Sequence, residues 1–468
     1  MVLLFNAAFM AISAGISIYN HDSGFIPLLL SMLIAVVLAL FPLVFVPYNA
    51  EISNKEGYAI VVLSWLVSCL VGTLPYLLWG GEFTLVNAWY EVVSGYTTTG
   101  STILNDVEAL PPSLLFWRAS THFIGGIGIV LFALVVMPAF GKIKTALSRI
   151  ELSALAKDNF KYQTRKAIKV IVIVYIGLTI AETVLLKWAG MTWLDSVCNA
   201  FSTIATGGLS TKNLSIAYYN SPTIEIIIMF FMFVSGLHFG LIWGTLMFRK
   251  GNLFKSAVAS YYFFSMIIGI ALVTISIKGP VYDTWLDALR YASFQVLSVG
   301  TSTGYATADS SVWPPFAMLV MIFFILQCAC SGSTSGGIKA DRVVIFFKTL
   351  KRQVIKLQHP NAVIPVKVRK FIVDEELVSG TILFIALYVF VVFISTLLLT
   401  AMGVDIMSSF SASAACMGNV GPGFGIVGSM TNYSSIPDLG KWLLSIVMLL
   451  GRMEIYGLLL LFLMKSWK

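Results

Sequence analysis

The chain has 468 residues, of which 58% are hydrophobic and only 11% are charged. An ordinary soluble domain is about 25% charged, so the composition excludes that class and indicates a protein that crosses a membrane many times. The net charge of +8 would favour a nucleic-acid partner in a soluble protein. Here the basic residues are concentrated in loops between apolar runs, and we expect no nucleic-acid binding.

Apolar runs of spanning length occur throughout the chain, since a helix needs about 20 residues to cross the hydrocarbon core. They lie near residues 2–19, 27–47, 57–79, 114–138, 167–190, 223–248, 257–277, 314–348, 376–402 and 440–464. The first run has no Lys or Arg ahead of it, which favours a retained helix over a signal peptide. We therefore predict an all-α polytopic membrane protein with an N-terminal two-helix hairpin over residues 1–50.

A loop of small residues recurs four times after this hairpin. The copies are Thr97–Thr102, Ile204–Gly208, Thr301–Tyr305 and Gly418–Pro422. Each follows a short apolar segment, too short to span the membrane, and precedes a long apolar run. With Gly100, Gly207, Gly304 and Gly421 taken as equivalent, the period is roughly a hundred residues. We predict four pore repeats, each with a helix, a pore helix, a loop and a second helix. Their bounds are residues 51–150, 151–255, 256–370 and 371–468.

The basic residues fall mainly in alternate loops. The largest groups lie within residues 142–169, 249–255 and 339–370. The positive-inside rule assigns such loops to the cytoplasm. Both termini are then cytoplasmic, and the four glycine loops lie on the outer side.

The four loops predict a pore for a monovalent cation. Loops that follow short helices can meet on one axis and present rings of backbone carbonyls, as in potassium filters. Glycine permits the backbone angles that this requires, and the C-terminal ends of the pore helices attract a cation. The loops contain no Asp or Glu, which favours a weakly hydrated ion. The residues expected to bind K⁺ are Thr98, Thr99, Gly100, Ala205, Thr206, Gly207, Ser302, Thr303, Gly304, Asn419, Val420 and Gly421.

The run at 314–348 is interrupted by small residues. They are Ser331, Gly332, Ser333, Thr334, Ser335, Gly336 and Gly337. Such residues form poor helix, and irregular backbone at membrane depth needs protein or water around it. We predict a gating loop beneath the filter. The alternatives are a simple kink or a phosphate site, although the phosphate-loop pattern fails at Ile338.

Charged and titratable residues also lie inside apolar runs. Arg452 lies deep in the last run and Glu182 in the fifth, where a charge is usually functional. We expect Arg452 to face the ion path and Glu182 to face other helices. A buried pair between Arg452 and Glu454 is the alternative, but residues two apart on a helix point to different faces. We interpret His122 and His238 as helix-packing residues rather than as ligands.

The motifs together resemble a known superfamily. They are TTTGST, ATGGLS, TSTGYA, GNVGPGFG, WRASTHFIGGIGIV at 117–130, SGSTSGGIK at 331–339 and LGRMEIYG at 450–457. They look like the potassium transporters that include bacterial TrkH and KtrB and the plant HKT proteins, and the N-terminal hairpin makes the chain most similar to TrkH. The resemblance covers residues 57–464.

The resemblance implies potassium uptake across a bacterial inner membrane by a homodimer with a pore in each subunit. It also implies contact with membrane lipid, a cytoplasmic nucleotide-binding regulatory subunit of the TrkA type, and no organic cofactor. The filter glycines would be Gly100, Gly207, Gly304 and Gly421, with a gating loop at 331–337 and Arg452 as a positive barrier below the filter.

Two residues bear on selectivity. Val420 stands where a threonine precedes the glycine in other loops, which makes the ring unequal and its selectivity less strict. Serine at position 100 would imply sodium passage in this family, so Gly100 favours potassium. A sodium-permeable or sodium-coupled transporter of the same fold remains the alternative. An organic-solute transporter is disfavoured because the repeats share one orientation, and the sequence offers no catalytic set that would indicate an enzyme.

Overall fold

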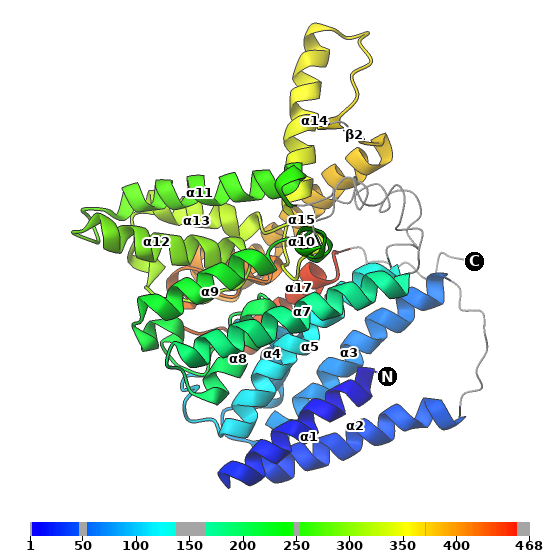
Figure 1. Cartoon of the computed structure of the whole chain (residues 1–468), viewed down its shortest axis with the longest axis vertical. Helices are drawn as coiled ribbons and strands as arrows, with labels where there is room; N and C mark the ends of the chain where they lie inside the picture. The colour runs from blue at the N-terminus through cyan, green and yellow to red at the C-terminus, as the bar shows by residue number, and fades with distance from the viewer. Residues whose placement is uncertain (1, 46–53, 137–163, 248–252, 370, 456–468) are drawn as a thin grey trace.

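The computed structural model describes residues 2–45, 54–136, 164–247, 253–369 and 371–455. Their regular secondary structure is almost entirely helical (Figure 1), which confirms the predicted all-α fold. The described exception is a short antiparallel pair, β1 (Lys367–Val368) with β2 (Phe371–Ile372). The predicted repeat boundaries at 50, 150 and 370 lie outside the described residues.

The N-terminal hairpin consists of α1 (Val2–Asn20) and α2 (Phe25–Phe45). The two helices pack on each other, α1 also contacts α5 and α2 contacts α3, so the hairpin lies beside the first repeat (Figure 1). Asp22 in its turn accepts hydrogen bonds from Ser113 N–H at 3.1 Å and from the Ser113 hydroxyl at 2.8 Å. Because Ser113 lies in the first turn of α5, this carboxylate joins the hairpin to the first repeat.

Asp22→Asn is expected to destabilise the protein by about 1–2 kcal/mol at neutral pH, the size of one or two lost hydrogen bonds. Burial alone would raise the pKa of Asp22, but hydrogen bonds from Ser17, Gly24 and Ser113 outweigh it and lower this pKa below 3.8. A carboxylate with a lowered folded-state pKa contributes stability above its unfolded pKa and loses it as pH falls through the folded value. The difference in thermal unfolding temperature between variant and parent should therefore narrow below about pH 4. Asp283→Asn, in the exposed loop after α11, is the control; an equal deficit at pH 3 and pH 7 would contradict the prediction.

Each repeat contributes an outer helix, a pore helix and an inner helix. The outer helices are α3 (Asn54–Trp79), α7 (Thr164–Trp188), α11 (Ala257–Ile277) and α15 (Glu375–Ala401). The pore helices are α4 (Leu85–Tyr96), α8 (Trp193–Ile204), α12 (Trp285–Gly300) and α16 (Ile406–Gly418). The inner helices are α5 (Pro112–Val136), α9 (Pro222–Ser235) with α10 (Phe239–Leu246), α13 (Pro315–Leu326) with α14 (Ala340–Gln358), and α17 (Asp438–Arg452). Short 3₁₀ turns, η2 (Ser215–Tyr219), η3 (Leu253–Lys255), η4 (Ser310–Val312) and η5 (Gly425–Val427), lie in the loops.

All four pore helices begin with the same cap. The side chain of the residue before each helix accepts a hydrogen bond from the backbone N–H of the third helical residue. The capping residues are Thr84, Thr192, Thr284 and Asp405. Thr and Asp are favoured at this position because they satisfy an N–H that has no partner within the helix.

The repeats close into a ring because each inner helix packs on the pore helix of the next repeat. Thus α5 contacts α8, α9 contacts α12, α13 contacts α16, and α17 returns to α4 of the first repeat. This cyclic packing brings the C-terminal ends of all four pore helices toward a shared axis.

Two of the predicted spans are broken in the structure. The run at 223–248 is wrong as one helix, because α9 ends at Ser235 and α10 leaves it at an angle of 104°. The run at 314–348 is non-helical from Gln327 to Lys339, a longer break than residues 331–337. By length and composition, the described residues contain five helices able to span a membrane, within α1, α3, α7, α11 and α15, or up to six if the bent pair is counted as one span. The tail of the last predicted run, beyond Ile455, lies outside the described residues.

Candidate ion-conduction site

The four pore helices end in the same hydrogen-bonded turn. A residue with a left-handed backbone stands just after the C-cap of α4, α8 and α12 and is itself the C-cap of α16. These residues are Thr98, Thr206, Ser302 and Asn419, with φ of 51°, 56°, 59° and 52°. The next residue donates its N–H to the carbonyl five positions back, at 2.8–2.9 Å in every repeat. This is a Schellman motif, which usually has glycine at the left-handed position. Thr98 and Thr206 are β-branched, so their conformation is strained, and strain kept at equivalent positions points to a functional site.

A second left-handed residue, always glycine, follows two positions later. These residues are Gly100, Gly208, Gly304 and Gly421, with φ of 81°, 79°, 81° and 91°. A Cβ atom on any of them would overlap a carbonyl oxygen of the following repeat. The pairs are Gly100 with Gly207 O, Gly208 with Thr303 O, Gly304 with Val420 O, and Gly421 with Thr99 O. The contacts pass once through all four repeats and return to the first, so the loops form a closed ring of main-chain atoms.

In the second repeat the structure shifts the predicted alignment of the four glycines by one residue. Gly208, rather than Gly207, has the left-handed backbone and the carbonyl contact of the other ring glycines. Gly207 occupies the place that Thr99, Thr303 and Val420 hold elsewhere. Ala205 is the C-cap of α8 and corresponds to Thr97 rather than to a ring residue. Two consecutive glycines permit either alignment in sequence, and only the hydrogen-bonded turn distinguishes them.

The side chains of two of these left-handed residues, Thr206 and Ser302, contact the segment between α13 and α14. Thr206 Oγ1 donates to Thr334 Oγ1 at 3.3 Å, and Ser302 Oγ accepts from Gly336 N–H at 3.1 Å. Thr334 Oγ1 in turn donates to Ile204 O, at the end of α8, at 2.9 Å. The predicted gating loop therefore contacts the C-terminal ends of α8 and α12 directly.

Thr98 and Asn419 differ in their surroundings. The Thr98 hydroxyl is buried and has no hydrogen-bond partner within the described part of the chain. Asn419 Nδ2 donates to Thr99 Oγ1 at 3.0 Å and to Met448 O at 3.0 Å. The fourth loop, which lacks a threonine, is thus tied to the first loop and to α17 by an amide.

Arg452 links the loop to two inner helices. It is the last residue of α17 and only 2% exposed. Nη1–H donates to Thr334 O at 2.6 Å and Nη2–H donates to Gly125 O, on α5, at 3.2 Å. Glu454 instead pairs with Arg342 of α14 at 2.8 Å. The alternative of an Arg452–Glu454 pair is therefore wrong.

The break between α9 and α10 also contacts the loop. His238 caps α10, with Nδ1 accepting from Gly240 N–H at 3.0 Å. Cys330 N–H donates to Gly236 O at 3.0 Å, and Phe239 N–H donates to Gly332 O at 3.3 Å. The break in the second repeat thus provides the surface on which the loop of the third repeat rests.

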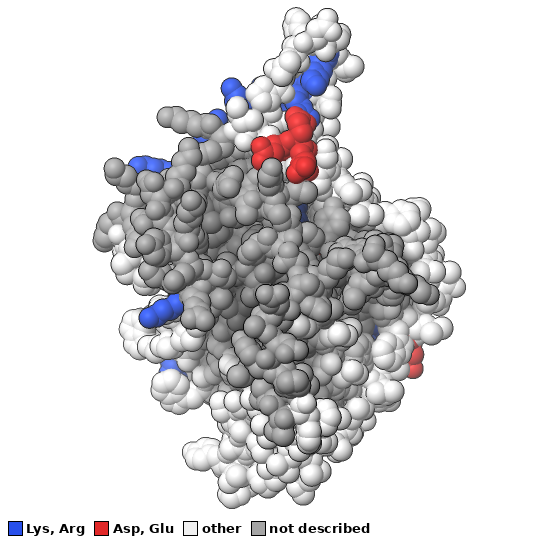
Figure 2. Space-filling model, turned by 90° about the vertical axis from the view of Figure 1, so that its right-hand side faces the viewer, with Lys and Arg blue, Asp and Glu red and all other residues white. Residues whose placement is uncertain are grey.

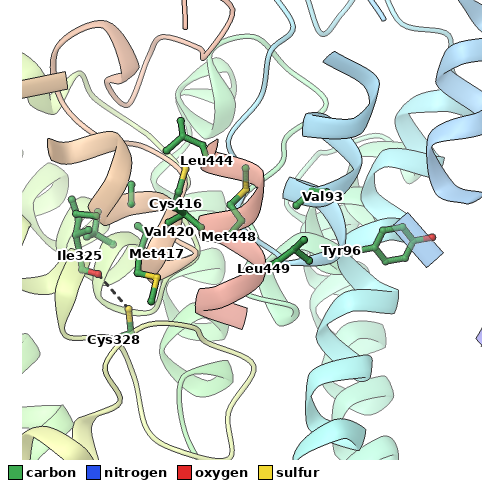
Figure 3. Close-up of a cluster of buried hydrophobic side chains, with 14 of the residues drawn as sticks. Val93, Tyr96, Ile325, Cys328, Cys416, Met417, Val420, Leu444, Met448 and Leu449 are labelled. Carbon is green, nitrogen blue, oxygen red and sulfur yellow. Dashed lines mark hydrogen bonds between the residues drawn. The ribbon is translucent and has the colours of Figure 1, made fainter. Parts of the chain in front are cut away.

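Apolar side chains of α17 pack against the first and fourth pore helices, α4 and α16. Figure 3 shows Leu444, Met448 and Leu449 of α17 lying between α4 and α16. Val93 and Tyr96 come from α4, and Cys416 and Met417 from α16, and all of these side chains are buried. Close-packed interiors resist small displacements, so α17 fixes the positions of two pore-helix ends.

A profile of the TrkH family, described as cation transport proteins, matches residues 31–267 and 253–468. The chain belongs to the TrkH family. The Trk system potassium uptake protein TrkH of Salmonella typhimurium is 35% identical over 90% of this chain and 87% of its own length. The Trk system potassium uptake protein TrkG of Escherichia coli is 32% identical over 89% of this chain and 86% of its own length.

A solved structure agrees with this assignment. The crystal structure of the potassium transporter TrkH from Vibrio parahaemolyticus superposes with a TM-score of 0.87, at 29% identity, over 98% of this chain and 96% of that one. The predicted resemblance is therefore confirmed. Because the TrkH family is one of transport proteins, the prediction that the chain is not an enzyme is confirmed as well.

This TrkH-family chain has a polar cavity beside the ring. All four ring glycines line it, together with residues that follow them in the loops, among them Ser101, Thr102 and Ser210. Arg118 and Lys212 also line this cavity. Residues 331–337 are absent from the lining of this polar cavity, here called the vestibule, so the vestibule and the predicted gating loop contact different parts of the ring.

Sequence reasoning missed the buried ion pair beside this vestibule. Arg118 Nε–H donates to Glu91 Oε1 at 2.7 Å, and Nη1–H donates to Ser210 O, in the second repeat, at 2.8 Å. Glu91 also accepts from the Thr102 hydroxyl at 3.0 Å and from Ile103 N–H at 3.0 Å. Buried charges need such partners. Through these bonds the pair holds the first loop at Thr102 and Ile103 and the second loop at Ser210. The sequence offered one signal for this pair: Glu91 is an acid within a short apolar segment, and Arg118 is a base near the start of the apolar run that follows.

Proposed function

We propose that this protein is a potassium uptake transporter in which K⁺ passes through the ring of main-chain carbonyls. The observation that carries the proposal is the closed cycle of contacts in which each ring glycine abuts a carbonyl of the next repeat. Carbonyl oxygens in a ring can replace the water around a potassium ion. The names of the relatives, which are potassium uptake proteins, support the same ion. The residues that would bind K⁺ are Thr98, Thr99, Gly100, Thr206, Gly207, Gly208, Ser302, Thr303, Gly304, Asn419, Val420 and Gly421.

The composition of the ring supports a second candidate, sodium permeation. The residues before the ring glycines are Thr99, Gly207, Thr303 and Val420. Two of these four positions lack a hydroxyl, so the ring is unequal and discriminates less strictly than a symmetric one. Sodium passage, alone or coupled to potassium, is therefore the alternative within the same fold.

Gating is assigned to residues 331–337 together with Arg452. The loop contacts the ends of two pore helices through Thr334 and Gly336, and the guanidinium of Arg452 holds the carbonyl of Thr334. A segment without helix at membrane depth can change its backbone more readily than a helix can. In this arrangement the loop closes the path below the ring, and its displacement opens it.

The proposed setting is a bacterial inner membrane, with both termini in the cytoplasm and two chains forming a homodimer. Exposed apolar side chains on α15, such as Phe390, Phe393 and Leu397, suit contact with lipid. The protruding α14 carries Lys348, Lys351 and Lys356, and Figure 2 shows basic side chains on this end of the molecule above an acidic group. A cytoplasmic regulatory subunit of the TrkA type would bind here, close to the segment that leads to the loop.

Purified protein in liposomes is expected to give a reversal potential near the potassium equilibrium value when potassium and sodium gradients are opposed. Rubidium uptake into cells that lack their own potassium uptake should also be restored, and excess potassium should compete better than sodium. Liposomes without protein and cells carrying an empty vector are the controls. A reversal potential near the sodium value would favour the alternative, and no cation current at all would exclude both.

A further inference from the structure

In the first and third repeats, a pair of threonine hydroxyls connects the ring to the end of the pore helix. Thr97, the C-cap of α4, lies with its hydroxyl 2.8 Å from that of Thr99. Thr301, the C-cap of α12, lies with its hydroxyl 2.7 Å from that of Thr303. In both repeats the side chain that precedes the ring glycine is therefore held by the end of its own pore helix.

The second repeat cannot form such a pair. Its C-cap is Ala205, which has no hydroxyl, and the residue before the ring glycine is Gly207, which has no side chain. The φ of Gly207 is not in the left-handed region, unlike that of Gly208. The backbone conformation therefore does not require glycine at position 207, and another cause must be found.

That cause is His122, which comes from α5 of the first repeat. A Cβ atom on Gly207 would overlap three ring atoms of the imidazole. His122 is fully buried, and its Nδ1 shares a hydrogen bond of 3.0 Å with Ser202 Oγ, in the last turn of α8. Gly207 N–H donates to the carbonyl of the same Ser202 at 2.8 Å. One imidazole thus fills the space behind Gly207 and holds the helical turn that positions it.

We propose that His122 is a positioning residue that determines ion specificity. Its imidazole replaces the missing threonine pair of the second repeat and fixes the carbonyl of Gly207, which faces Gly100. This inference rests on the proposed function, because it concerns the same ring of carbonyls. Discrimination between potassium and sodium depends on where the carbonyl dipoles of the ring are placed. Without the His122 side chain the Gly207 carbonyl can move, and the ring then admits the smaller ion more easily.

The test is the potassium-to-sodium permeability ratio of the full-length protein in liposomes. His122→Ala is expected to lower this ratio about fivefold, the effect of one lost hydrogen bond. Gly207→Thr alone should abolish transport or prevent folding, because its side chain overlaps the imidazole. The double variant His122→Ala with Gly207→Thr should recover a ratio closer to the parent than either single variant. His122→Gln, whose amide can still bond to Ser202, should keep the parental ratio.

Ser120→Ala is the matched control, since Ser120 is a buried residue of α5 whose hydroxyl bonds to the Phe116 carbonyl of its own helix. It should leave the ratio unchanged. The inference is overturned if folded His122→Ala keeps the parental ratio, or if Gly207→Thr alone transports normally. If His122→Ala does not fold, His122→Gln and the double variant decide the question. A parent protein that itself shows no preference for potassium would instead refute the proposed function.

Discussion

Gly208→Ala is expected to lower rubidium uptake by at least about tenfold. A left-handed backbone costs a residue with a side chain about 1–2 kcal/mol, and roughly 1.4 kcal/mol corresponds to a factor of ten. The added Cβ would also overlap the carbonyl oxygen of Thr303. The loop must then move away from the third repeat, and the ring of carbonyls opens at this point.

Gly177→Ala is the control for this variant, because a Cβ at Gly177, on α7, would meet no atom within 4 Å. It should transport like the parent. Uptake is normalised to the amount of protein in the membrane, so that loss of function is separated from loss of folding. Parental uptake and selectivity in Gly208→Ala would show that the ring is not the ion path.

The sequence predicted most of the helices because the apolar length of a membrane span is a local feature. Apolar length identified the outer helices, and α11 was predicted at its observed bounds, Ala257–Ile277. The bend between α9 and α10 was missed because residues 223–248 are apolar on both sides of it. The bend is fixed by hydrogen bonds from Cys330 and to Gly332, which belong to another repeat and leave no local signal.

The alignment of the second loop was predicted wrongly because it too depends on contacts with another repeat. Small residues marked the four loops, but nothing in the pair Gly207-Gly208 says which glycine joins the ring. That choice follows from the end of α8 and from His122, which lies in a different repeat. The position of Arg452 suggested function, whereas its partner Thr334 is 118 residues away in the chain. Contacts of this kind depend on the closure of the ring and cannot be read from spacing.

Arg452→Ala is expected to increase cation flux. The guanidinium binds the carbonyl of Thr334 in the loop and that of Gly125 on α5, so it holds the loop against the ends of the pore helices. A hydrogen bond from a charged donor is worth about 1.5–3 kcal/mol, so losing the one to Thr334 O would favour the displaced loop by about ten- to a hundredfold. Removing a fixed positive charge from beneath the ring acts in the same direction, because it lowers the barrier to a cation.

Arg452→Lys separates these two contributions. Lysine keeps the charge but lacks the planar fork that reaches two carbonyls at once. If the charge is the barrier, the lysine variant should conduct like the parent; if the hydrogen bonds hold the loop, its flux should lie between those of the parent and the alanine variant. Lys441→Met is the control. Lys441 is another buried cation of α17, but its ammonium group donates to Asn87 Oδ1 at 2.9 Å and to Asp438 Oδ1, neither of which belongs to the loop. Unchanged or reduced flux through well-folded Arg452→Ala would contradict the gating role of this residue.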